Sequence, residues 1–95
     1  MESDGFAPHE GTDFLVKAAD GTELVLRLVK VRSLGHQPNA PRTDPFALEF
    51  EGPARPALDQ GTHRIEHALL GSLDIFIVPI GVDEYGGRLY EAIFN

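Results

Sequence analysis

The sequence predicts an all-β protein of about six short strands, folded as a compact antiparallel barrel or as a two-sheet sandwich. Three observations predict this fold class: an Asp20-Gly21 pair typical of a tight hairpin, strict apolar–polar alternation over 46–51, and little helical periodicity. A barrel is favoured, because closure removes the exposed sheet edges of so short a chain. We expect all 95 residues to form one domain, with an N-terminal arm over 1–12.

The first two strands are predicted on either side of the Asp-Gly pair, which tolerates the positive φ angles of a tight turn. They cover 13–18 and 23–31. In the second strand the polar positions shift from Arg27 to Lys30, an odd offset that indicates a β-bulge or a change of exposed face. Apolar residues occupy both faces of this strand, so we expect it to be central and bent.

A long proline-rich loop is predicted over 33–45, where three prolines remove amide donors and disfavour helix. A loop of about a dozen residues is long for a compact domain, and is either a flexible excursion or a functional surface. We take this loop and the preceding strand as the possible interaction surface, with the residues Pro38, Asn39, Pro41, Arg42, Val29 and Val31.

The strand predicted over 46–51 is half-buried. Its inward residues are Phe46, Leu48 and Phe50. Glu49 and Glu51 alternate with them, as a solvated strand face requires, and this explains the two carboxylates better than a glycosidase pair does.

The segment that follows is ambiguous, because Thr62 could cap a helix and Gly71 could end one. We favour a strand over 62–67 and a turn that ends at Gly71, since a two-turn helix between hairpin strands would need a longer connection. A helix remains the alternative.

The last two strands are predicted over 73–80 and 88–94, and they should pair with each other. The first is rich in β-branched and aromatic residues on both faces, which indicates a central position. Pro79 cannot donate to a ladder, so this strand should reach an edge or a bulge there.

Composition excludes several classes of function. The chain has no cysteine, which rules out disulfides, thiolate chemistry and zinc–thiolate sites. Its formal net charge of −7 opposes nucleic-acid binding, and its longest nearly apolar run is about half the length of a membrane-spanning helix. The acidic N-terminus does not resemble a signal peptide, so we expect a cytoplasmic protein; export by a specialised system is compatible with the sequence.

No catalytic constellation is evident, and we expect neither enzymatic activity nor a cofactor. None of the three serines, Ser3, Ser33 and Ser72, lies in a Gly-x-Ser-x-Gly elbow. The Gly86-Gly87 pair is a turn rather than a phosphate loop, because no Lys-Ser or Lys-Thr pair follows it.

The histidines are the remaining candidates for chemistry: His9, His36, His63 and His67. On a strand, His63 and His67 would lie roughly 13 Å apart, too far to hold one metal ion, whereas on a helix they could chelate it. We favour a structural role, in which the His67 ring orders a turn by bonding a backbone carbonyl and His63 is a surface side chain.

Four motifs carry a family resemblance. They are Pro45 to Pro53, Gln60-Gly61-Thr62, Phe76 to Gly81 and Tyr90 to Asn95. Together with Phe6, Gly11 and Phe14, they resemble a bacterial family of small domains of unknown function. The resemblance implies no established activity, and it associates such genes with those of phage-tail-collar-like proteins, which would suggest a fibre or surface assembly.

The leading hypothesis is a non-enzymatic interaction or assembly module that binds a protein partner or forms a homo-oligomer. Apolar residues occupy both faces of 24–31 and 73–80, and such surplus apolar surface would mediate contact. The alternative is a small-ligand-binding barrel or small enzyme with a pocket lined by His63, His67 or Tyr90. Protonation of the four histidines as the pH falls through about 6.5 would change the formal charge from −7 toward −3 and favour association.

Overall fold

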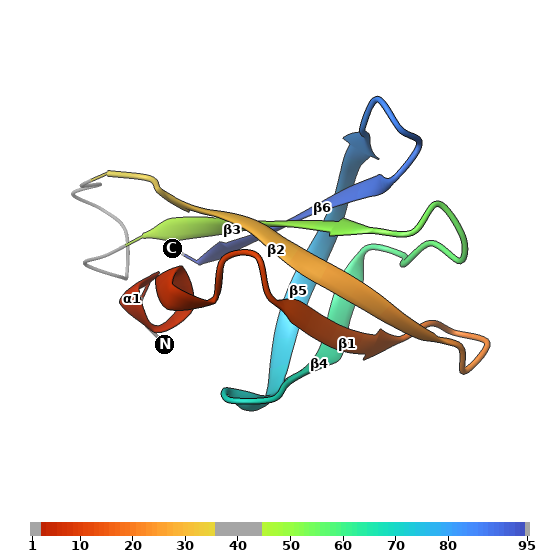
Figure 1. Ribbon diagram of the computed structural model, residues 1–95, viewed down its shortest axis with the longest axis horizontal. Helices are drawn as coiled ribbons and strands as arrows, with labels where there is room; N and C mark the ends of the chain where they lie inside the picture. Colours follow the sequence, from red (N-terminus) through yellow and green to blue (C-terminus); the bar gives the residue numbers. More distant parts are fainter. Residues whose placement is uncertain (1–2, 36–44, 95) are drawn as a thin grey trace.

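A computed structural model describes residues 3–35 and 45–94 as a closed antiparallel barrel preceded by a short helical segment (Figure 1). The elements are α1 (Ser3–Phe6), the 3₁₀ turn η1 (Ala7–His9), β1 (Asp13–Lys17), β2 (Glu23–Ser33), β3 (Phe46–Gly52), β4 (Gly61–His67), β5 (Gly71–Val82) and β6 (Arg88–Phe94). The strand order is β1-β2-β3-β6-β5-β4, and β4 returns to pair with β1. The predicted all-β class is confirmed, and of the two architectures the barrel is the one observed.

The β1–β2 hairpin forms where the Asp-Gly pair predicts it. Gly21 has a φ of +89°, and the Asp20 carboxylate accepts a hydrogen bond from the Thr22 amide at 2.8 Å. The Ala18 amide donates to the Thr22 carbonyl at 2.8 Å, next to the first strand pair, Lys17 with Glu23. Local turn chemistry is therefore sufficient to fix this register.

Both predicted irregularities in the sheet are present. The β2–β3 register shifts between Leu28 and Lys30, so that Val29 lies in a bulge. The β5–β6 register shifts between Pro79 and Gly81, where proline cannot donate a ladder hydrogen bond.

Strand β5 connects two parts of the barrel. Residues 71–77 pair with β4, and residues 78–82 pair with β6. Residues 61–67 are strand and 68–70 form a turn, as we predicted. The helical alternative for this segment, on which histidine chelation depended, is not observed.

The expectation that β2 and β5 would be central strands does not apply to a closed barrel, in which no strand is central or at an edge. A closed barrel has one interior, and each strand directs alternate side chains to it. In β5 the inward Ile75 and Ile77 are buried, whereas Phe76 is 51% exposed. In β2, Leu26 and Leu28 are buried and Val25 is 46% exposed.

The barrel interior is filled by side chains. Its largest fully buried members include Phe14, Leu26, Phe46, Phe50, Ile65, Ile77 and Tyr90. The Tyr90 hydroxyl accepts a hydrogen bond from the Leu58 amide at 3.0 Å, so that the β3–β4 connection is fastened to the core. Every strand contributes to this core.

The predicted N-terminal arm contains the helical segment that periodicity did not reveal. Phe6 at the end of α1 is buried, and its ring lies 5.8 Å from that of Phe46 and 5.7 Å from that of Phe94. Figure 1 shows α1 beside the start of β3 and the end of β6. Among residues 3–35 and 45–94, the structure has no helix with the length and apolar character needed to cross a membrane.

Candidate interaction surface

An apolar strip runs along the outside of the barrel over β5 and β6. We define the outer apolar strip as Phe76, Val78 and Ile80 of β5 with Leu89 and Ile93 of β6. Phe76, Ile80 and Ile93 are 51%, 48% and 53% exposed, respectively, and the other two residues are half-buried.

Strand pairing places these residues together. Val78 pairs with Glu91, and Phe76 and Ile93 lie two residues away on the same side of that pair. At the other end of the strip, Ile80 and Leu89 line a shallow hollow of about 130 Å³ with the bulged Val29 and residues 49–51. The strip is therefore continuous along β5, whereas on β6 the outward Glu91 lies between Leu89 and Ile93.

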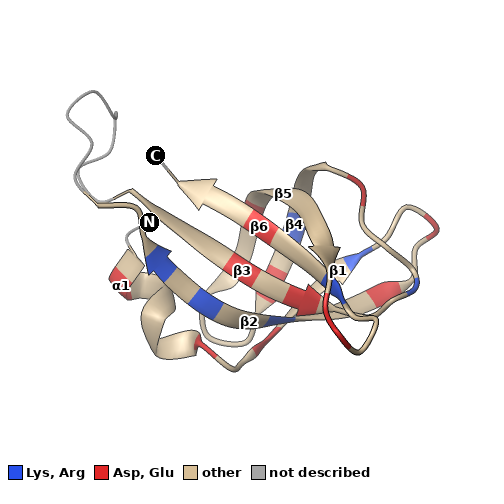
Figure 2. Ribbon diagram, turned by 90° about the horizontal axis from the view of Figure 1, so that it is seen from above, with Lys and Arg blue, Asp and Glu red and all other residues tan. Residues whose placement is uncertain are grey.

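The charges that border the strip are paired within the chain. The Arg27 Nη2 atom lies 2.9 Å from Glu51 Oε1, and Arg32 Nη2 lies 3.0 Å from Glu91 Oε2. Arg32 Nε is also 3.7 Å from Glu49 Oε1. Figure 2 shows this arrangement as basic positions on β2 facing acidic positions on β3 and β6. The strip thus has a nearly neutral border in a strongly acidic protein.

The structure describes only two of the six residues that the sequence predicts as an interaction surface, and these two differ in exposure. Val29 is 50% exposed and borders the strip, whereas Val31 is partly buried and packs against the core. The remaining four residues, Pro38, Asn39, Pro41 and Arg42, lie outside the described residues.

Sequence reasoning pointed to the apolar faces of 73–80 as surplus contact surface but did not name Phe76, Ile80 or Ile93 as site residues. The available signal was the presence of apolar residues on both faces of 73–80, which fits either a strand buried on both sides or a barrel strand with an apolar outer face. Only closure of the barrel decides between the two.

A second polar cluster surrounds His67 at the end of β4. The His67 Nδ1 atom accepts hydrogen bonds from the Leu69 and Leu70 amides at 3.0 and 3.2 Å, and Nε2 lies 3.0 Å from Thr12 Oγ1. The expectation that this ring bonds a backbone carbonyl is wrong, because the turn directs two amide donors at it. Burial, followed by the nearby His9, lowers the pKa of His67.

The other histidines do not assemble into a metal site with it. His63 is the histidine that contacts a carbonyl, with its Nε2 atom 2.8 Å from Asp59 O. In the described parts of the chain, no three His, Asp or Glu side chains are placed to hold a metal ion. His36 lies outside those parts.

Comparison with known proteins gives a family without an assigned activity. Residues 1–94 match the family described as domain of unknown function DUF6916. No curated protein and no solved structure shows a significant match to this chain. Because the match spans nearly the full length of the sequence, the protein belongs to the DUF6916 family of domains of unknown function.

Proposed function

We propose that this domain is a non-enzymatic assembly module that contacts a second copy of itself through the outer apolar strip. The observation that carries the proposal is the row of five apolar side chains on the outside of β5 and β6. Covering water-exposed apolar side chains with a partner lowers the free energy of the system. Contiguous patches of such side chains therefore mark interaction sites.

Electrostatics favour a second copy as the partner. Two chains with a formal charge of −7 repel each other over most of their surfaces. The border of the strip is less strongly charged, because Arg27 and Arg32 offset most of the charge of the three neighbouring carboxylates. Copies that meet along the strip bring few unpaired like charges together, whereas a strongly basic or acidic partner would find little net charge of opposite sign there.

The resemblance to bacterial domains associated with phage-tail-collar-like proteins supports a role in a bacterial surface or fibre-like assembly. A repeating assembly requires contacts between identical chains, which agrees with a self-contact along the strip.

The ligand-binding or enzymatic alternative has less support. Tyr90 is fully buried and its hydroxyl is hydrogen-bonded to Leu58, so it lines no open interior pocket. Both ring nitrogens of His67 are engaged, and His63 contacts a backbone carbonyl. A hollow of about 560 Å³ lies on the outside, between β2 and residues 51–56, and none of these three side chains lines it; His67 lines a smaller hollow of about 370 Å³, where its ring nitrogens are already bonded.

The test is the concentration dependence of mass, measured by sedimentation equilibrium. Wild type should form a dimer or larger oligomer, and a Phe76→Ser/Ile93→Ser double variant should raise the dissociation constant about tenfold or more, as loss of a central apolar contact does. Leu69→Ser is the matched control, because Leu69 is 79% exposed in the β4–β5 turn, away from the strip. A strictly monomeric wild type at millimolar concentration would contradict the proposal.

A further inference from the structure

The N-terminal segment closes one end of the barrel. We call residues 3–12, which comprise α1, η1 and the following turn, the N-terminal plug. Its Phe6 ring packs against both Phe46 and Phe94, and its Glu10 carboxylate accepts a hydrogen bond from the Val31 amide at 2.6 Å. The plug is therefore attached both to the core and to the edge of β2.

A chain of hydrogen bonds links the plug to β4 through His67. Thr12 Oγ1 donates to the His9 carbonyl at 2.6 Å, so it uses its single proton there and must accept from His67 Nε2 at 3.0 Å. Nε2 consequently carries the ring proton. Nδ1 must be unprotonated, because it accepts from the Leu69 and Leu70 amides. The two bonds at Nδ1 therefore require a neutral imidazole, whereas the Nε2–H bond to Thr12 is possible in either protonation state as long as the ring keeps its orientation.

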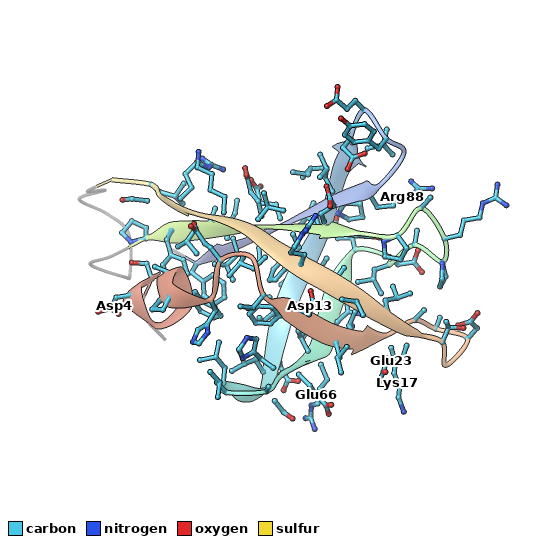
Figure 3. All side chains as sticks on the ribbon, viewed as in Figure 1. Asp4, Asp13, Lys17, Glu23, Glu66 and Arg88 are labelled. Carbon is cyan, nitrogen blue, oxygen red and sulfur yellow. The ribbon has the colours of Figure 1, made fainter. Side chains whose placement is uncertain are left out.

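No neighbouring carboxylate in the described residues is placed to stabilise a positive charge on a protonated His67 ring. His67 as a whole is 8% exposed, and the rings of His9 from η1 and Phe14 from β1 have their centroids 4.6 and 4.5 Å from that of its ring. Asp13 of β1 and Glu66 of β4 line a hollow beside His67, but neither carboxylate forms an ion pair with the ring within the described residues. The Glu10 carboxylate is bonded to Val31, and Asp4 lies on the exposed side of α1 (Figure 3).

We propose that His67 is a pH-sensitive latch that holds the N-terminal plug on the barrel, and that protonation of its Nδ1 atom releases the plug. The added proton, taken from solvent, occupies the lone pair that accepts the two turn amides. The Leu69 and Leu70 N–H groups then face another donor, and the ring has to rotate away from them. Rotation breaks the bond to Thr12 and moves a cation against His9, which is itself on the plug.

Release would change the surface of the barrel end. Phe6 would leave its site beside Phe46 and Phe94, and these two rings, which stack with centroids 4.7 Å apart, would lose the contact with it. The latch would thus convert a pH change into exposure of aromatic surface. This inference is independent of the outer apolar strip, which lies on β5 and β6.

The test follows the plug by NMR on the full chain between pH 7.5 and 5.5. In wild type, nuclear Overhauser contacts between the Phe6 and Phe94 rings should weaken as the pH falls. Hydrogen-exchange protection of the Gly11 amide, corrected for intrinsic exchange, should decrease roughly tenfold, as loss of two hydrogen bonds would cause. The Gly11 amide is a suitable probe because it donates to the Leu28 carbonyl at 2.6 Å from within the plug.

Two variants separate the latch from a general acid effect. His67→Asn keeps an acceptor for the turn amides and cannot gain a charge, so its plug contacts should be independent of pH in this range. His63→Gln is the matched control, because it removes another β4 histidine, and it should behave as wild type does.

The proposal would be overturned if the plug contacts of wild type did not depend on pH. It would also be overturned if His67→Asn showed the same pH dependence as wild type. If His67→Asn does not fold, the imidazole titration of wild-type His67 decides the question. A titration midpoint that coincides with loss of the Phe6–Phe94 contacts supports the latch, and separate midpoints refute it.

Discussion

Tyr90 shows how one buried polar atom can fix a connection that has no regular structure. Its hydroxyl is the acceptor for the Leu58 amide, and both residues lie within the core. A buried amide without an acceptor loses its hydration and gains nothing in return. The tyrosine is therefore a tether for the β3–β4 connection as well as a large apolar side chain.

Tyr90→Phe should reduce the free energy of unfolding by about 1–3 kcal/mol, because the Leu58 amide would be left buried and unpaired. Urea denaturation monitored by circular dichroism measures this change. Tyr85→Phe is the control, since Tyr85 is 88% exposed, and it should leave stability unchanged. Equal effects of the two substitutions would show that the hydroxyl of Tyr90 has no special role.

The stability of the domain should fall as the pH decreases below about 6.5. The pKa of His67 in the folded state lies below its ordinary value of 6.5, so near this pH the unfolded chain binds more protons than the folded chain does. Protons therefore favour unfolding until the pH passes below the folded-state pKa. Urea midpoints measured from pH 8 to 5 should decrease in wild type and decrease less in His67→Asn; identical profiles would contradict this assignment.

At the scale of elements, the predictable features are those that local chemistry determines. The hairpin at Asp20-Gly21, the bulge after Leu28 and the irregularity at Pro79 all follow from residues close together in sequence. Helix α1 has only four residues, too few for a periodic pattern, and its burial depends on Phe46 and Phe94 from distant strands. Such an element cannot be recognised without the tertiary structure.

The candidate surface shows the same limit. Alternation identifies which residues of β5 share a face, but it does not say whether the second face is covered. The exposure of Phe76 and Ile80 follows from closure of the barrel, a property of all six strands together. Likewise, the contacts of His67 with Thr12 and His9 cross more than fifty positions of sequence, and no spacing rule reveals them.

The β1–β2 hairpin gives a test of one element. Gly21→Val should reduce the free energy of unfolding by about 1–2 kcal/mol, because a β-branched residue is strained at a φ of +89°. No other atom lies within 4 Å of a side-chain carbon added at Gly21, so backbone strain is the only expected cause. Gly21→Asn, which tolerates this conformation, should cost less in the same denaturation experiment; equal costs would argue against strain.

For the whole molecule, net charge sets the balance between repulsion and contact. The formal charge of −7 opposes association, and protonation of four histidines would bring it toward −3. His67 contributes to this change at a lower pH than an ordinary histidine, because its pKa is lowered.

Self-association should therefore strengthen as the pH falls from 7.5 to 5.5. Light scattering at constant protein concentration measures the change in mean mass. The Phe76→Ser/Ile93→Ser variant should respond less than wild type, because repulsion decreases in both but only wild type keeps the apolar contact. A signal that stays constant over this range would contradict the expectation.

The contact between Phe6 and Phe94 also bears on whether the order of the strands in the chain could be changed by circular permutation. Because these two rings pack together, the N-terminal and C-terminal parts of the chain lie at the same end of the barrel (Figure 1). A short linker could therefore join them without crossing the fold, and new ends could be opened in the β5–β6 turn beside the exposed Tyr85, which leaves the His67 contacts of the 68–70 turn intact. The domain is thus a natural candidate for circular permutation, in which the same barrel is built from a reordered sequence.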